Sequence, residues 1–156
     1  MFRGATTISL DAKGRVAIPT RYRDELVDCC ERQLVLTVAV NEKGKGEPGC
    51  LWLYPLPEWE ALEQTINKLP TLNKIANRLR RFVIGNASEC EMDNQGRLLL
   101  PEHLRVYADL DKQVVLVGQL KKFEIWNEEL WRRNVDDWME DGDDTEGLEQ
   151  LGALSF

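Results

Sequence analysis

The chain has 156 residues, a hydrophobic content of 43% and a formal net charge of −7, which predicts one globular unit or two merged halves. Its apolar runs fall short of the roughly 18 residues of a membrane helix, and the N-terminus lacks an apolar signal region. Its four cysteines have no C-x-x-C spacing and it has a single histidine, which argue against a metal site, a disulfide framework and histidine-based catalysis. We therefore expect no cofactor, no metal, no membrane and a reduced, cytoplasmic setting.

The charge is unevenly distributed along the chain. The last 17 residues, from Glu140 onward, supply six of the negative charges and no Lys or Arg, so residues 1–139 carry a net charge of −1. Residues 1–23 contain five basic residues and one acidic residue, for a net charge of +4. Because affinity for phosphate depends on the local potential, the acidic overall balance does not exclude nucleic-acid binding.

A short unit occurs twice. Residues 5–19 and residues 87–101 share the pattern D-x-x-G-R followed by a proline, and both the aspartates and the prolines are offset by 82 residues. A repeat of this size does not bury a core alone, so its two copies are expected to pack on each other with pseudo-two-fold symmetry.

The first copy is predicted to be a β-hairpin followed by a helix. Residues 7–10 alternate polar and apolar side chains, as in a half-buried strand, and the alternation resumes at 16–18. Between them Gly14 permits a positive φ and Asp11 can accept hydrogen bonds from nearby backbone amides, which predicts a tight hairpin turn. Pro19 ends the second strand and begins a short helix over residues 20–29.

Further strands and helices are expected between the two copies. Residues 34–40 and 50–54 have strong β-propensity, and the polar, glycine-rich residues 41–49 between them predict a loop. Pro57 opens a helix that ends at Pro70, with an apolar face of Trp59, Leu62, Ile66 and Leu69. A second helix has an apolar stripe of Leu72, Ile75, Ala76, Leu79 and Val83, and Gly85 is placed to end it.

The second copy repeats this order with shorter connections. Residues 113–117 and 123–126 predict strands, a final helix covers residues 127–139, and the acidic tail is expected to be disordered. The predicted fold class is α+β, mainly β, with flanking short helices.

The two turns are the strongest candidate for function. A hairpin tip exposes its side chains, so Lys13 and Arg15 are expected to lie beside Arg3 and either Arg21 or Arg23, with Arg97 in the second copy. An arginine can grip phosphate or read guanine O6 and N7 in the major groove. Asp11, Gly14, Asp93 and Gly96 are assigned to bracing the turns. The alternative, left open here, is a purely structural repeat in which each arginine only pairs with its aspartate.

Several motifs together resemble the MraZ family. They are Met-Phe-Arg-Gly-Ala at 1–5, the D-x-x-G-R turns at 11–15 and 93–97, Pro-x-Arg-Tyr-Arg at 19–23 and Leu-Tyr-Pro-Leu-Pro-Glu-Trp at 53–59. The resemblance covers about residues 1–131. It implies two SpoVT-AbrB domains of the swapped-hairpin, double-split β-barrel type, at 5–58 and 87–130, separated by inter-repeat helices at 59–86 and followed by a C-terminal helix and acidic tail at 131–156.

The resemblance also implies a function. Family members are nucleoid-associated regulators that bind repeated boxes of double-stranded DNA upstream of their own gene, mostly repress it and the adjacent division and cell-wall genes, and assemble as ring-shaped homo-oligomers. It assigns DNA contact to the D-x-x-x-R elements, here Asp11, Arg15, Asp93 and Arg97. In the second copy Gln95 replaces Lys13 and His103 replaces Arg21, so this half is expected to contact DNA less strongly.

The sequence also bears on alternative functions and on its remaining basic and aromatic residues. An enzyme is disfavoured because Asp11 and Asp93, the only symmetric acid candidates, lie beside cations that keep them ionised. An antitoxin-like protein whose acidic tail engages a partner is the stronger rival. The basic residues at 78, 80 and 81 are expected on a solvated or internally paired face, although contact with DNA or a neighbouring subunit stays open. The five tryptophans are assigned to packing, some of them at subunit interfaces.

Overall fold

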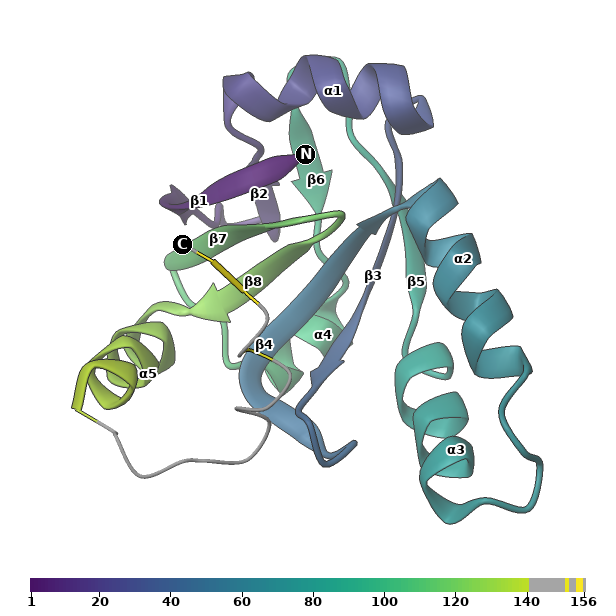
Figure 1. Ribbon diagram of the computed structural model, residues 1–156. Coiled ribbons are helices and arrows are strands. Elements are labelled where there is room, and N and C mark those ends of the chain that lie inside the picture. Colours follow the sequence, from purple (N-terminus) through teal and green to yellow (C-terminus); the bar gives the residue numbers. More distant parts are fainter. Residues whose placement is uncertain (141–150, 152–153, 156) are drawn as a thin grey trace.

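The computed structural model describes residues 1–140, 151, 154 and 155, and it has an α+β architecture (Figure 1). The predicted tail lies almost wholly outside the described residues. The strands and helices follow in chain order: β1 (Phe2–Ser9), β2 (Arg15–Ala17), α1 (Thr20–Cys30), β3 (Gln33–Val40), β4 (Gly46–Pro55), α2 (Leu56–Asn67), α3 (Lys74–Leu79), the π-helical segment η1 (Arg80–Ile84), β5 (Ser88–Glu91), β6 (Arg97–Leu99), α4 (Glu102–Tyr107), β7 (Gln113–Leu120), β8 (Phe123–Asn127) and α5 (Glu128–Glu140).

The strand order shows that the two copies share one sheet. The six-stranded antiparallel sheet runs β1-β7-β8-β4-β3-β5, and a separate ribbon pairs β2 with β6. The order reads as two equivalent halves, and the pairs β1–β7, β8–β4, β3–β5 and β2–β6 each join one copy to the other. The symmetry axis passes between Trp52 and Glu124 in the sheet and between Val16 and Leu98 in the ribbon. The prediction that the copies pack on each other is confirmed.

The double-split barrel implied by the resemblance is not confirmed, and the expectation of a regular hairpin needs correction. The six-stranded sheet is open, because β1 and β5 form its edges. Within the first copy a single bridge, from Leu10 to Val16, joins the two strands expected to form a hairpin. The strands instead pair with the other copy, because Phe2 and Ile8 of β1 and Val16 of β2 bury their side chains in a core that both copies build. Only the turn between them keeps the predicted form.

The main core lies between the inner face of the sheet, the β2–β6 ribbon, α1 and α4. The ribbon contributes Val16 and Leu98, and α1 and α4 contribute Leu26 and Leu104, all of them inaccessible to solvent. Burying one such leucine stabilises the folded state by about 1.5–3 kcal/mol. Because these side chains point inward, their neighbours on the ribbon point to solvent.

Helices cover the outer face of the sheet in two places. α2 and η1 pack over Val35 and Tyr54, and α5 packs over Val115 and Trp126. Trp59 and Trp126 are buried, as predicted for packing side chains. Trp138 differs, because it lies in the last turns of α5 and 60% of its surface is exposed.

Two connections differ from their prediction. The expected loop at 41–49 is only a short turn, because β4 begins at Gly46 and pairs it with Val40. The expected second helix begins at Lys74 and widens into a π-helix at Arg80. The side chain of Asn73 caps this helix by accepting hydrogen bonds from the N–H groups of Ile75 and Ala76. Leu72 therefore precedes the helix and is 96% exposed, and Ile75 is 53% exposed, so neither belongs to a buried stripe.

No helix in the described part of the chain combines the length and apolar character needed to cross a bilayer.

Candidate nucleic-acid interface

The first turn is built around the carboxylate of Asp11. Its Oδ1 accepts hydrogen bonds from the backbone N–H groups of Lys13 and Arg15, both at 2.9 Å. The chain reverses between them because Gly14 adopts a φ of 84°, a left-handed conformation that glycine tolerates without steric cost. The remaining oxygen, Oδ2, accepts a hydrogen bond of 2.9 Å from Nε of the Arg15 side chain. One carboxylate therefore shapes the turn and orients the guanidinium group.

The second turn repeats this geometry. Asp93 Oδ1 accepts from the N–H groups of Gln95 and Arg97 at 2.9 and 2.8 Å, and Oδ2 accepts from Nε of Arg97 at 3.1 Å. Gly96 has a φ of 75°. The turn-bracing roles predicted for the aspartates and glycines have this geometric basis in both copies.

Both aspartates are ionised at neutral pH. Hydrogen bonds from the backbone N–H of Arg15, and then from its side chain and from the N–H of Lys13, lower the pKa of Asp11 below its usual value. The backbone N–H of Arg97 is likewise the main cause of the lowered pKa of Asp93. Each arginine thus faces a permanent anion that fixes its direction.

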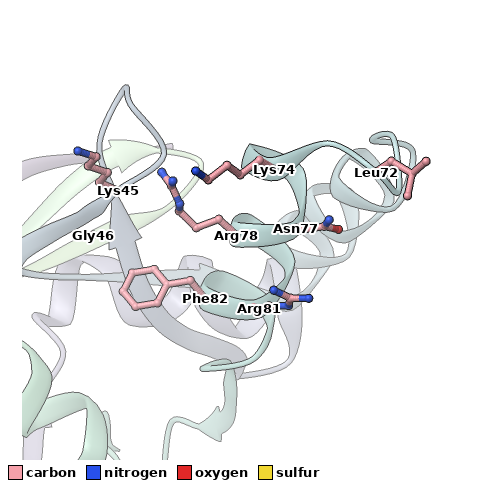
Figure 2. Close-up of a pocket in the computed structure, with 8 residues that line it drawn as sticks. All are labelled: Lys45, Gly46, Leu72, Lys74, Asn77, Arg78, Arg81 and Phe82. Atoms are coloured by element: carbon pink, nitrogen blue, oxygen red, sulfur yellow. The ribbon is translucent and has the colours of Figure 1, made fainter.

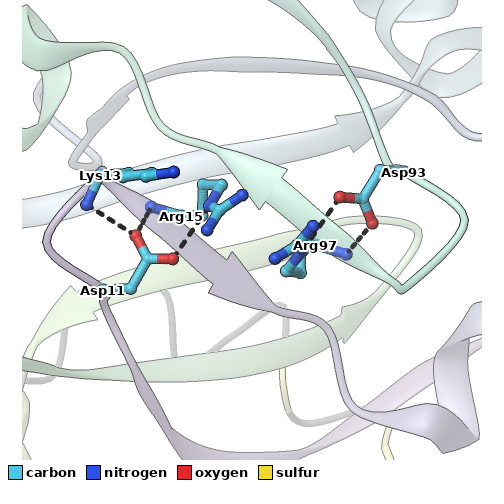
Figure 3. A network of polar contacts seen from close by, with 5 residues as sticks. All are labelled: Asp11, Lys13, Arg15, Asp93 and Arg97. Atoms are coloured by element: carbon cyan, nitrogen blue, oxygen red, sulfur yellow. Dashed lines mark hydrogen bonds and ion pairs between the residues drawn. The ribbon is translucent and has the colours of Figure 1, made fainter.

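The two arginines lie on the exposed face of the β2–β6 ribbon (Figure 3). Arg15 is opposite Leu99 and Arg97 is opposite Ala17, so the arginines form a diagonal pair across the symmetry axis, which corresponds to a separation of roughly 7–8 Å. Their side chains are 27% and 35% exposed. Within the described residues neither arginine donates a hydrogen bond from its terminal guanidinium nitrogens, so these donors have no partner inside the described fold.

An arginine from each helix lies over the turn of the other copy. Nε of Arg105 on α4 donates to the carbonyl of Leu100 at 2.9 Å, and its guanidinium group lies against Gly14. Nε of Arg23 on α1 donates to the carbonyl of Ile18 at 2.7 Å, and its guanidinium group lies against Gly96. Each turn is therefore a composite of both copies, and the two turns together gather four arginines.

The remaining predicted contact residues are placed differently. Lys13 is exposed in the first turn. Arg21 is exposed but engaged, because it donates hydrogen bonds to the hydroxyls of Thr6 and Tyr22 and lies over the Tyr22 ring. Arg3 follows the inward-pointing Phe2 on β1, and the alternation of a strand places it on the opposite face. The structure thus does not bring Arg3 to the turns.

Arg105 was missed by sequence reasoning, although a signal was available. It stands 82 residues after Arg23, the same offset that relates the two turns. Because α4 has only six residues and opens with Glu102 and His103 where α1 has Thr20 and Arg21, the local sequence around Arg105 does not resemble the first copy.

A third turn of the same construction lies between β3 and β4. Asn41 Oδ1 accepts from the N–H groups of Lys43 and Lys45 at 3.0 and 3.1 Å, and Gly44 has a φ of 70°. Here Asn replaces Asp and Lys replaces Arg, so the cation at the fifth position has no carboxylate partner in its own turn. From the sequence this segment was predicted only to be a loop.

Comparison with known proteins identifies the family. The profile of the family described as "MraZ protein, putative antitoxin-like" matches residues 1–82 and again residues 83–146. The chain is 57% identical to the transcriptional regulator MraZ of Methylococcus capsulatus over 160 aligned residues, covering 100% of both chains. It is 50% identical to that of Thioalkalivibrio sulfidiphilus, covering 93% of this chain and 92% of the relative. It is 53% identical to that of Pseudomonas aeruginosa, covering 84% and 83%.

The repeated profile match agrees with the two equivalent halves of the sheet, and identity of this level extends over the whole chain in the Methylococcus relative. On these grounds, the chain belongs to the MraZ family.

Proposed function

We propose that this protein is a sequence-specific DNA-binding transcriptional regulator, and that the β2–β6 ribbon is its DNA-reading element. The observation that carries the proposal is the pair of aspartate-braced arginines, Arg15 and Arg97, on the exposed face of a two-stranded ribbon. The relatives are named transcriptional regulators, which supports the same function.

The dimensions of the ribbon suit the major groove of DNA. This groove is about 12 Å wide and admits a two-stranded β-ribbon. Arginines roughly 7–8 Å apart match about two base steps of 3.4 Å along one strand. Since Asp11 accepts a hydrogen bond only from Nε of Arg15, the terminal guanidinium nitrogens remain available to bond guanine O6 and N7 or a phosphate.

The surrounding cations supply affinity for the phosphate backbone. Lys13, Arg23 and Arg105 lie beside the turns, and each phosphate contact adds sequence-independent affinity by releasing counterions. The first turn carries Lys13 where the second carries Gln95, so the ribbon contacts DNA more strongly through its first copy. Arg21 adds charge at the first copy only, because His103 takes its place in the second.

Assembly and repeated sites complete the proposal. One short ribbon reads few base pairs, so several copies in a ring bound to successive boxes would gain specificity through avidity. We propose that the boxes lie upstream of the protein's own gene, that binding represses this gene and the adjacent division and cell-wall genes, and that the protein acts in the cytoplasm at the nucleoid. The two halves correspond to two merged SpoVT-AbrB units.

The direct test is footprinting of the purified full chain on the DNA immediately upstream of its own gene. A periodic set of protected boxes is expected, and a scrambled duplex of the same length and composition is the control. Protection that is equal on both duplexes, or absent from both at protein concentrations up to the micromolar range, would contradict sequence-specific regulation.

A second candidate is an antitoxin-like protein that binds DNA through the ribbon and a protein partner through its acidic end. The matching family description contains the term antitoxin-like, and six acidic residues lie between Glu140 and Glu149. Deletion of residues 141–156 separates the candidates. If the protein is a regulator, the truncated chain keeps its footprint and no protein partner co-purifies with either chain. If it is an antitoxin, a protein partner co-purifies with the full chain and is lost from the truncated chain.

A further inference from the structure

A groove that lies away from the ribbon is lined by cations. It has a volume of about 780 Å³ and lies between α3, η1 and the β3–β4 turn. Figure 2 shows Lys74 and Arg78 extending from α3 toward Lys45 on the turn, with Phe82 beside them. Arg81 and Leu72 also line the groove, and none of the described residues that line it is acidic.

These cations are not used within the fold. In the described part of the chain, the side chains of Lys45, Lys74, Arg78 and Arg81 form no ion pair and no hydrogen bond. Arg80 provides the contrast, because its guanidinium group donates to the carbonyls of Ile66, Leu69 and Pro70 and so secures the end of α2. The groove therefore holds a concentrated positive charge without a counter-charge from its own walls.

The turn that carries Lys45 is held by the same pattern of hydrogen bonds as the two D-x-x-G-R turns. Asn41 fixes it through two side-chain hydrogen bonds, and Asn41 N–H donates to the carbonyl of Lys45 at 2.8 Å. The other wall is held by Thr37, whose buried hydroxyl donates to the carbonyl of Val83 in η1 at 2.6 Å. The groove is thus shaped by both walls before any partner binds.

Exposed apolar side chains flank the cations. Leu72 is 96% exposed and Ile75 is 53% exposed, and Phe82 lines the floor. A partner that fits this surface must combine negative charge with apolar side chains. Duplex DNA supplies the charge, but the apolar groups that it offers to side chains are chiefly thymine methyl groups within the major groove.

The chain presents such a surface at its other end. The last turns of α5 carry Asp136, Asp137 and Glu140, all exposed, together with Trp138 and Met139, which are 60% and 83% exposed. Upstream on α5, Arg132 pairs with Glu128 and Arg133 pairs with Glu129, and no ion pair among the described residues involves Asp136 or Asp137. The sequence beyond Glu140 adds five more acidic residues before residue 150.

We infer that the cationic groove of one copy binds the acidic, apolar C-terminal end of α5 from a second copy. Opposite charges meet at Arg78 and Arg81 on one side and Asp136 and Asp137 on the other, while Trp138 and Met139 cover Leu72 and Ile75. In Figure 1, α3 and α5 lie at opposite ends of the molecule, so the contact joins different copies rather than folding back on one.

Such a contact joins two different surfaces, the groove of one copy and the end of α5 of the next. In a row of copies, one groove stays free at one end and one α5 stays free at the other. The contact is heterologous, so it continues until it closes into a ring or extends as a filament. The inference rests on the proposed function in one respect, because it supplies the contact that would build the multivalent DNA-binding assembly. The assembly itself can be measured without DNA.

The test compares three variants of the full chain by sedimentation velocity. The groove variant carries Arg78→Glu and Arg81→Glu, and the helix variant carries Asp136→Lys and Asp137→Lys. The control variant carries Lys112→Glu and Lys121→Glu, two exposed lysines outside the groove, and has the same change in charge as the groove variant. The groove and helix variants are expected to sediment as 18.0 kDa monomers at concentrations where the wild type and the control are assembled.

Combining the four substitutions of the groove and helix variants reverses both charges and is expected to restore assembly. This rescue separates a lost contact from a folding defect, because a misfolded groove would not recover. Raising NaCl from about 0.1 M to about 1 M shortens the Debye length from about 10 Å to about 3 Å and is expected to dissociate the wild type. A groove variant that stays assembled, or a combined variant that stays monomeric, overturns the inference.

A DNA measurement on the same proteins distinguishes this failure from failure of the proposed function. The groove variant keeps Arg15 and Arg97, so its affinity for a duplex with one box is expected to match that of the wild type. If it remains assembled but loses affinity for the single box, the groove is a DNA-binding surface and the inference is wrong. If the wild type assembles through the groove but binds no box, only the proposed function fails.

Discussion

Arg105 of the second copy lies directly against Gly14 of the first. A Cβ atom built on Gly14 would lie 2.7 Å from Cζ of Arg105, closer than real side chains approach. The N–H of Leu100 also donates to the carbonyl of Gly14 at 2.9 Å. The turn of one copy is therefore shaped by the helix start of the other, and this relationship has measurable consequences.

Gly14→Ala is expected to destabilise the fold and weaken DNA binding together. The φ of 84° disfavours any side chain by about 1–2 kcal/mol, and the new methyl group would displace Arg105. Urea unfolding and fluorescence anisotropy with a box duplex measure the two effects. Gly44→Ala is the matched control, because its φ is 70° but its turn lies away from the ribbon. It should lose stability and keep DNA affinity; equal losses of affinity would contradict the prediction.

Arg15→Ala is expected to abolish specific binding, and Arg97→Ala to weaken it less, because the second turn lacks a neighbouring lysine. Each lost phosphate contact should also lower the slope of log K against log salt by about 0.9. Binding isotherms across a salt series measure both quantities. Arg133→Ala, which removes an exposed α5 arginine paired with Glu129, is the control. Equal effects at the two turns would show that the copies are equivalent. Full DNA affinity of Arg15→Ala would show that the ribbon is not the DNA-binding element.

Arg105→Ala and Arg23→Ala are expected to behave alike, since each guanidinium group bonds a carbonyl and covers the opposite turn. Loss of a hydrogen bond from a charged group lowers stability by about 1.5–3 kcal/mol, reduced here by partial exposure. DNA affinity should fall for both variants. A decrease confined to Arg23→Ala would show that the second copy contributes nothing through α4. Urea midpoints and anisotropy report the outcome.

Asp11→Asn tests whether the carboxylate is needed for the turn or for the arginine. Asn41 shows that an amide oxygen can hold the same turn, so the variant should keep the turn and lose only the charge-dependent part of its stability at pH 7. DNA affinity should fall, because Arg15 loses its anionic partner. The pKa of Asp11 is lowered on folding, so its stabilising contribution is present above the unfolded pKa, near 3.8, and is lost as pH falls through the lowered folded value. The unfolding midpoints of wild type and variant should become equal in that acidic range. Midpoints that are already equal near pH 6 would contradict the lowered pKa of Asp11.

Thr37→Val is expected to loosen η1 and with it the cationic groove. The Thr37 hydroxyl is fully buried and donates to the Val83 carbonyl, and leaving such a buried carbonyl unpaired costs about 1–3 kcal/mol. Hydrogen exchange of residues 80–84 should accelerate more than that of β7. Uniform acceleration through the whole chain would instead indicate a global loss of stability with no specific role for η1.

Much of the site could be read from local sequence. The D-x-x-G-R spacing predicts a turn because its hydrogen bonds join residues at most four apart, from Asp11 to Lys13 and Arg15. The same locality explains the confirmed strands at 34–40 and 113–117 and the helix at 20–29. The helix predicted over 72–83 was wrong in part, because the Asn73 cap and the tertiary bond from Thr37 to Val83 set its limits.

By itself, then, the sequence determined the doubled unit, the turns and the four residues that brace them, because short-range hydrogen bonding and φ preferences suffice for these. Only the tertiary structure decided that β1 and β2 pair with β7 and β6, that Arg105 and Arg23 cross to the opposite turns, and that Lys45, Arg78 and Arg81 share one groove. These contacts depend on how two similar halves bury one common core, and residues far apart in the chain meet only when that core forms.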